Sequence, residues 1–96
     1  MPAYITLGNF TDQGARTIKD SPDRYEAFKA LAEAAGVTVK SVHWTTGAYD
    51  MVLVSEGPED ALMTLNMKMA ALGNIRTQTL RGFSITEMRK LVTALK

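Results

Sequence analysis

The sequence predicts an α+β domain in which a four-stranded antiparallel sheet carries two long helices on one face. Two segments with apolar residues at helical spacing each end at a glycine, Gly36 and Gly73. Segments rich in β-branched and aromatic residues lie before, between and after them, and the pair Gly47 and Ala48 splits the middle one as a two-residue hairpin turn would. The order strand, helix, hairpin, helix, strand is that of the split-βαβ, ferredoxin-like motif.

Two outer segments are predicted as strands that pair beside the hairpin. Residues 3–10 and 75–83 alternate between apolar and more polar side chains, as Ile5 and Leu7 do with Thr6. This period of two indicates strands whose two faces meet different surroundings.

The first long helix is expected to follow a short helical turn. Thr11 is a residue type that begins helices, and residues 15–19 can form one turn. Ser21 is expected as the N-cap of the long helix, with Pro22 at its first position and Gly36 after its end. Its apolar stripe consists of Tyr25, Phe28, Leu31, Ala32 and Ala35.

The hairpin is predicted over residues 37–46 and 49–56, and a type II′ turn would place Trp44 opposite Met51. One face of the hairpin, on which Trp44 is expected to be a core residue, then holds Val42, Trp44, Tyr49, Met51 and Leu53. The other face holds Val39, Ser41, His43, Asp50, Val52 and Val54.

The second long helix begins near Pro58, which acidic residues follow, and ends at Gly73. Its stripe consists of Leu62, Leu65, Met69 and Leu72. Met63 and Met67 fall outside this stripe, which indicates a surface for packing against another subunit or partner.

An extra C-terminal helix is predicted by the capping-box spacing of Ser84 and Glu87. Its apolar stripe consists of Met88, Leu91, Val92 and Leu95.

The sheet face away from the helices is expected to meet a second copy of the chain. Val39, Val52 and Val54 lie there beside His43 and Asp50, a mixture too apolar to remain in water. Covering this face with the sheet of a partner predicts a homodimer, or a larger homo-oligomer.

Composition limits the other partners. Eleven basic and ten acidic residues give a net charge of +1, which offers no field for nucleic acid or an anionic membrane. There is no cysteine and no apolar run near the ~20 residues that a membrane span needs. No segment resembles a secretion leader, and we expect a single cytoplasmic domain over residues 1–96.

Several strings match, in order and spacing, the GYD domain family, whose namesake motif is met by Gly47, Tyr49 and Asp50. The strings cover most of the chain and are residues 9–14, 18–24, 46–50, 56–60 and 73–77. The resemblance implies a dimeric α/β barrel related to the ferredoxin-like fold. It implies no settled activity, because the family is largely uncharacterised. Barrels of this shape include cofactor-free monooxygenases, haem-handling enzymes and small-ligand sensors, but that is an analogy of fold alone.

His43 and Asp50 are the candidate catalytic residues. The hairpin register places them diagonally on one face, where the carboxylate could orient the imidazole as a base or as an axial haem ligand. The alternatives are a structural histidine and a carboxylate that stabilises the hairpin. Two ligands are too few for a divalent metal, and no nucleotide, zinc-protease or triad motif occurs.

Basic residues cluster where the first long helix begins. Arg16, Lys19 and Arg24 could hold an anionic ligand there, or could simply form a solvated helix end, since Asp20 and Asp23 offset their charge.

Three functions remain open from the sequence. The leading hypothesis is a small-molecule pocket on the face between two sheets, lined by Tyr4, Thr6, His43, Asp50, Thr77 and Thr79. The second is an oxidative or isomerising enzyme, cofactor-free or haem-dependent, that uses His43 and Asp50. The third is a structural or regulatory subunit whose methionine-rich helix docks a partner. No cofactor is assigned.

Overall fold

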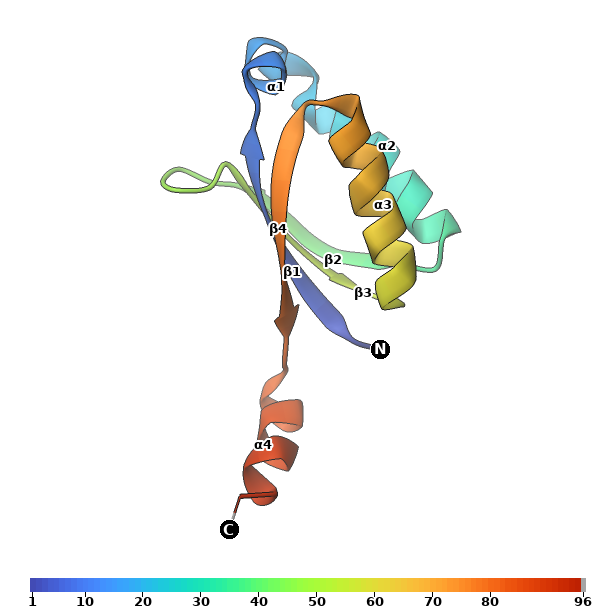
Figure 1. Ribbon diagram of the computed structural model, residues 1–96, viewed down its shortest axis with the longest axis vertical. Coiled ribbons are helices and arrows are strands. Elements are labelled where there is room, and N and C mark those ends of the chain that lie inside the picture. The colour runs from blue at the N-terminus through green and yellow to red at the C-terminus, as the bar shows by residue number, and fades with distance from the viewer. Residues whose placement is uncertain (96) are drawn as a thin grey trace.

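The computed structural model describes residues 1–95 and has the predicted α+β, ferredoxin-like architecture (Figure 1). In chain order the elements are β1 (Ala3–Phe10), α1 (Asp12–Arg16), the 3₁₀ turn η1 (Ile18–Asp20), α2 (Ser21–Ala34), β2 (Thr38–Trp44), β3 (Met51–Glu56), α3 (Glu59–Leu72), β4 (Ile75–Gly82) and α4 (Ile85–Thr93).

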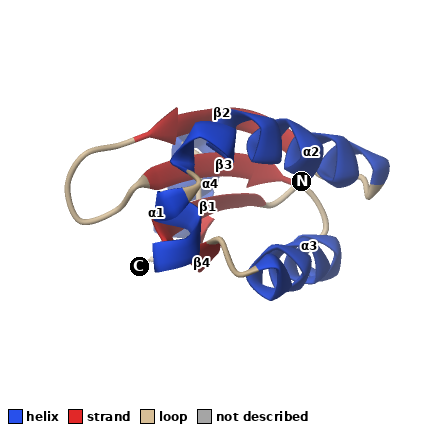
Figure 2. Cartoon of the chain, turned by 90° about the horizontal axis from the view of Figure 1, so that it is seen from above, coloured by secondary structure: helices blue, strands red, loops and turns tan. Residues whose placement is uncertain are grey.

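The sheet has the order β2-β3-β1-β4, with every neighbouring pair antiparallel. The helices α2 and α3 lie on the same side of it (Figure 2). The buried core between these two layers consists of Tyr4, Phe28, Ala32, Val37, Leu53, Leu62 and Leu65. As predicted, Gly73 ends α3 in the left-handed conformation, with φ of +80°.

A β-bulge in β2 changes which face one hairpin residue occupies. Val39 pairs with Ser55 while Ser41 pairs with Val54, so that Lys40 is an extra residue. One inserted residue reverses the alternation of side chains. Val39 therefore packs against the core beneath the helices, and its expected position on the open face is wrong.

The hairpin has the predicted register but a longer connection. Trp44 lies opposite Met51, as expected. The strands end at that pair, and residues 45–50 form a loop in place of a two-residue turn. At the end of this loop the backbone N–H of Asp50 donates to the Gly8 carbonyl of β1 at 2.8 Å, and its carbonyl accepts from the Thr45 N–H at 2.8 Å, so that Asp50 is bonded to β1 as well as across the hairpin.

The predicted N-cap role of Ser21 is wrong, because its backbone is already helical (φ −57°, ψ −43°) and it is the first residue of α2. The helix α2 follows η1 directly, and Ser21 accepts a hydrogen bond from the indole N–H of Trp44 at 3.0 Å. Trp44 packs edge-on against Tyr25 with ring centroids 6.0 Å apart. It is nevertheless 43% exposed and not a core residue, because β2 is an edge strand.

The helix α4 extends away from the two-layer body (Figure 1). The radius of gyration is 14.7 Å, above the roughly 12.5 Å typical of a compact chain of this length. The predicted capping box is confirmed: Ser84 accepts from the Glu87 N–H at 3.1 Å, and the Glu87 carboxylate accepts from the Ser84 N–H at 2.9 Å. A nine-residue helix is marginal alone, so these bonds matter to it.

We expect α4 to lose helicity in acid. The Ser84 backbone N–H, and more weakly Arg81, hold the pKa of Glu87 below its usual value of 4.5. Because the pKa is lower in the folded helix, the stabilisation is present above the unfolded value and is lost as pH falls through the folded one. Amide chemical shifts of α4, followed by NMR from pH 7 to 3, would show this loss. The variant Glu87→Gln should lack the transition; a transition unchanged in that variant would contradict the assignment.

Candidate functional site

Two of the strings that resemble the GYD family meet at one end of the molecule. The predicted helical turn begins earlier than expected, at Asp12, with Thr11 as its N-cap. Thr11 donates its backbone N–H to the Asn74 carbonyl at 3.2 Å and its hydroxyl to the Gly73 carbonyl. The side-chain amide of Gln13 donates to the Asn74 side chain at 3.0 Å. These bonds fasten α1 to the turn between α3 and β4.

The namesake motif performs the hairpin-stabilising role that was one of the two expected for it. The Asp50 carboxylate accepts from the backbone N–H of Phe10 at 2.9 Å. This bond lies just beyond the last β1–β3 pair, Gly8 and Met51. The Tyr49 hydroxyl donates to the Gln78 side chain at 3.1 Å. The Thr45 hydroxyl donates to the Tyr49 carbonyl at 2.6 Å. The motif thus ties the loop of residues 45–50 to β1 and β4.

Four of the six predicted pocket residues lie on the helix-covered face of the sheet. Tyr4 belongs to the core, and Thr6 and Thr77 line a cavity beneath the helices. Thr79 accepts a hydrogen bond from Asn66 of α3 at 3.2 Å. Their placement on the open face is therefore wrong. The bulky Tyr4 ring turns inward, and Thr6, two residues later on β1, therefore faces the same side. Thr79 pairs with Thr6 and Thr77 pairs with Gly8, so both threonines of β4 face that side as well.

His43 lies on the open face, exposed and paired with Val52. Asp50 lies in the hairpin loop. No hydrogen bond or ion pair joins these two residues within the described chain, and the Asp50 carboxylate accepts from the backbone N–H of Phe10 instead. The structure does not form the expected diagonal pair. Among residues 1–95 no cluster of three histidine, cysteine or acidic residues could hold a metal ion.

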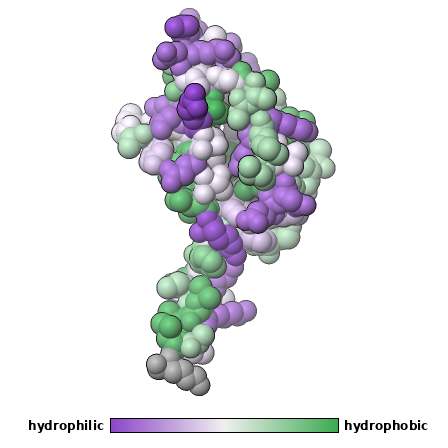
Figure 3. Space-filling view, viewed as in Figure 1, coloured by the Kyte–Doolittle hydropathy of each residue, from purple (hydrophilic) through white to green (hydrophobic). Residues whose placement is uncertain are grey.

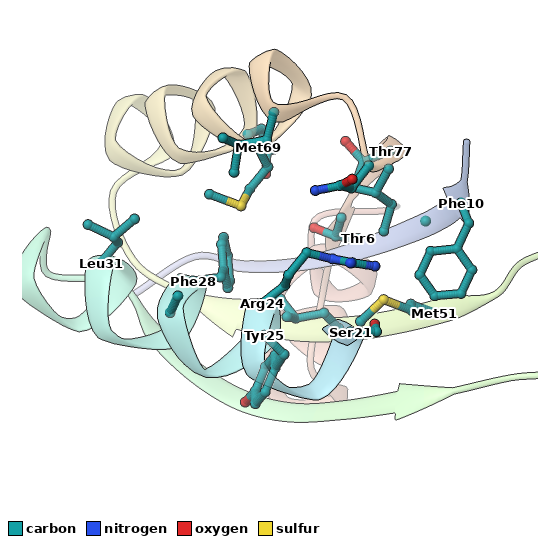
Figure 4. Close-up of a pocket in the computed structure, with 17 residues that line it drawn as sticks. Thr6, Phe10, Ser21, Arg24, Tyr25, Phe28, Leu31, Met51, Met69 and Thr77 are labelled. Atoms are coloured by element: carbon teal, nitrogen blue, oxygen red, sulfur yellow. The ribbon is translucent and has the colours of Figure 1, made fainter. Parts of the chain in front are cut away.

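An apolar cavity lies between the sheet and the two long helices (Figure 4). Its volume is about 230 Å³. Most of its wall is apolar and includes Phe28, Leu31, Leu53 and Met69. This cavity was not predicted from the sequence. The apolar stripes of the two long helices indicate which side chains face the sheet, but not whether those side chains fill the space between helices and sheet. Leu31 and Leu72 were assigned to those stripes, yet both remain exposed at the cavity.

Arg24 brings a positive charge to this apolar cavity. Its side chain extends from α2 toward Thr6 and Phe10 (Figure 4). The guanidinium donates to the Thr17 carbonyl at 2.9 Å and to the Gly14 carbonyl at 3.3 Å. The one side-chain ion pair within residues 1–95 joins Arg81 and Glu87, so Arg24 forms no ion pair with a carboxylate of that region.

Of the three residues in the predicted basic cluster, only one contributes to the cavity. Arg16 and Lys19 are exposed and do not line the cavity, whereas Arg24 does.

Apolar side chains are exposed on two helices. Met63 and Met67 of α3 are 56% and 54% exposed, in agreement with their predicted position outside the core stripe. Figure 3 shows apolar side chains gathered over α4, where the exposed residues are Ile85, Met88, Leu91, Val92 and Leu95. In the described part of the chain, no helix has both the length and the apolar character needed to cross a membrane.

Comparison of the sequence with known proteins identifies its family. The GYD domain model matches residues 4–92, a span that includes most of α4. A protein of Thermus thermophilus, named glutamine synthetase and cystathionine beta-lyase binding protein, is 32% identical over 90 residues, which cover 92% of this chain and 95% of that protein. The chain belongs to the GYD domain family.

Proposed function

We propose that this chain is a cytoplasmic protein-binding domain that docks onto other enzymes. The observation that carries the proposal is the similarity, over nearly the whole of both chains, to a relative named for binding glutamine synthetase and cystathionine β-lyase. The third hypothesis from the sequence, a structural or regulatory subunit, is the one that this name supports.

The docking surface that we assign is the exposed pair Met63 and Met67 on α3. The two side chains lie one helical turn apart and more than half exposed. Methionine side chains are flexible and polarizable, which suits a surface that must fit two unrelated enzymes. Together they form a short apolar ridge that a groove on a partner could receive.

The variant Met67→Glu should bind either enzyme at least tenfold more weakly. A charge at this ridge would be desolvated without a partner in the complex. Isothermal titration calorimetry with purified glutamine synthetase and cystathionine β-lyase of the host organism measures the effect. Lys68→Gln is the matched control, because it changes the net charge by the same amount on the adjacent residue of α3.

Two outcomes would count against this proposal. Equal affinity of Met67→Glu and the wild type would remove the ridge from the docking surface. Failure of the wild-type protein to bind either enzyme at micromolar concentrations would overturn the protein-binding function itself.

We also propose that the domain works as a homodimer, with the open sheet face as the interface. The apolar residues on this face are Ile5, Leu7, Val52, Val54 and Leu80. Helices α2 and α3 lie on the other face of the sheet, where Tyr4 and Leu53 join the core (Figure 2), and a second copy is the simplest cover.

Small-molecule binding is the second candidate function, favoured by the apolar cavity beneath α2 and α3. We relocate the proposed pocket there from the open face, with Thr6 and Thr77 retained from the residues expected to line it.

A further inference from the structure

Two polar groups at the cavity have donors that no residue of the described chain satisfies. The Thr6 hydroxyl is buried and has no hydrogen-bond partner. Buried hydroxyl groups are nearly always paired, and an orphan calls for an explanation such as a ligand. Thr6 and Arg24 both line the cavity (Figure 4).

Arg24 supplies the second unmatched group. Its three hydrogen bonds go to neutral oxygens, two on Thr17 and one on Gly14. A guanidinium has five N–H donors, and its Nε–H makes no hydrogen bond within the described chain. Charge and free donors are therefore both present where the cavity wall is otherwise largely apolar.

We propose that this cavity binds a small organic acid with an apolar body. The carboxylate would accept from Arg24 and from the Thr6 hydroxyl, and the body would lie among Phe28, Leu53 and Met69. This inference rests on the second candidate function and is independent of enzyme docking.

The size and charge of the cavity define the class of ligand. A dry cavity of about 150 Å³ admits benzene, so about 230 Å³ accommodates one ring or a branched alkyl group with its carboxylate. A nucleotide is too large. A single guanidinium within apolar walls matches a monoanion better than a phosphate dianion, which would demand more donors.

Benzoate and phenylacetate are the probes, with benzamide as the uncharged counterpart of benzoate. Binding can be followed by amide NMR shifts and by the fluorescence of Trp44, the single tryptophan, which packs against the cavity residue Tyr25. We expect both acids to shift cavity residues in the wild-type protein and to bind at least tenfold more tightly than benzamide.

Variants separate the two polar groups from effects on folding. Arg24→Met keeps the length of the side chain and should weaken benzoate binding at least tenfold. Thr6→Val replaces the hydroxyl by a methyl group, leaves the bonds of Arg24 intact, and should weaken it about threefold to tenfold. Arg16→Met removes an exposed positive charge from neighbouring α1 and should change nothing.

The outcomes are distinguishable. Equal binding of benzamide and benzoate, or benzoate affinity unchanged in both Arg24→Met and Thr6→Val, would overturn the organic-acid inference and leave small-molecule binding standing. No shift of any cavity residue with any probe at millimolar concentration would overturn both. Binding of the two enzymes would be unaffected in either case.

Discussion

Gly14→Ala is expected to destabilise the protein by about 3 kcal/mol, at the upper end of the range for overpacked sites. A Cβ at Gly14 would overlap the carbonyl oxygen of Asn74 and lie 2.8 Å from its carbonyl carbon. These are backbone atoms, which cannot rotate away as a side chain does. The same peptide is held by the Thr11 N–H, so relief requires breaking the attachment of α1 to the α3–β4 turn.

Urea unfolding followed by circular dichroism measures the change in the free energy of unfolding. Thermal unfolding measures the fall in Tm, which is expected to be about 12–24 °C for a domain of this size. Gly82→Ala is the control, because a Cβ there meets Ile5 at an ordinary 3.4 Å. If Gly14→Ala were as stable as Gly82→Ala, α1 would be free to move away from the turn.

The elements of this fold were predictable because their signals are local. The alternation of residues 3–10 predicts β1 with its observed bounds, and Gly73 ends α3 where predicted. The Ser84 capping box likewise lies within four residues of sequence. Such signals depend on near neighbours, which the sequence displays directly.

The faces and partners of several residues were not predictable, because they depend on distant contacts. The bulge at Lys40 reverses the side of Val39, and nothing in a run of β-formers marks a single inserted residue. Asp50 pairs with Phe10, forty positions earlier, and not with His43. The dipeptide at Gly47 and Ala48 suits a tight turn. The bond from the Phe10 N–H to the Asp50 carboxylate and the bond from the Asp50 N–H to the Gly8 carbonyl, however, hold the end of the loop against β1.

For the candidate site, too, the residues that line a pocket were partly predictable, whereas the face of the sheet on which they lie was not. Thr6 and Thr77 were predicted to line a pocket on the face between two sheets, and they line a cavity on the opposite, helix-covered face. The side of the sheet was misjudged because β1 has large apolar residues on both faces: Tyr4 points to the helices, and Ile5 and Leu7 point away. An open face that remains this apolar is the basis of the dimer prediction.

Val54→Glu is expected to convert the proposed homodimer to a monomer. Val54 lies on β3 between Ile5 of β1 and Ser41 of β2, within the apolar open face. Two-fold symmetry would bring two glutamates into the interface for each substitution. Burying each charge without a partner costs several kcal/mol, so the dissociation constant should rise at least about a thousandfold.

Light scattering coupled to size-exclusion chromatography gives the mass of wild type and variant at equal concentration. Thr46→Glu adds the same charge in the exposed hairpin loop and should remain dimeric. Because Val54 points away from the helices, circular dichroism of the variant should stay native, which separates dissociation from unfolding. A monomeric wild type would contradict the interface, and the open face would then need another cover. A dimeric Val54→Glu would instead move self-association to a different surface, with the exposed stripe of α4 as the next to test.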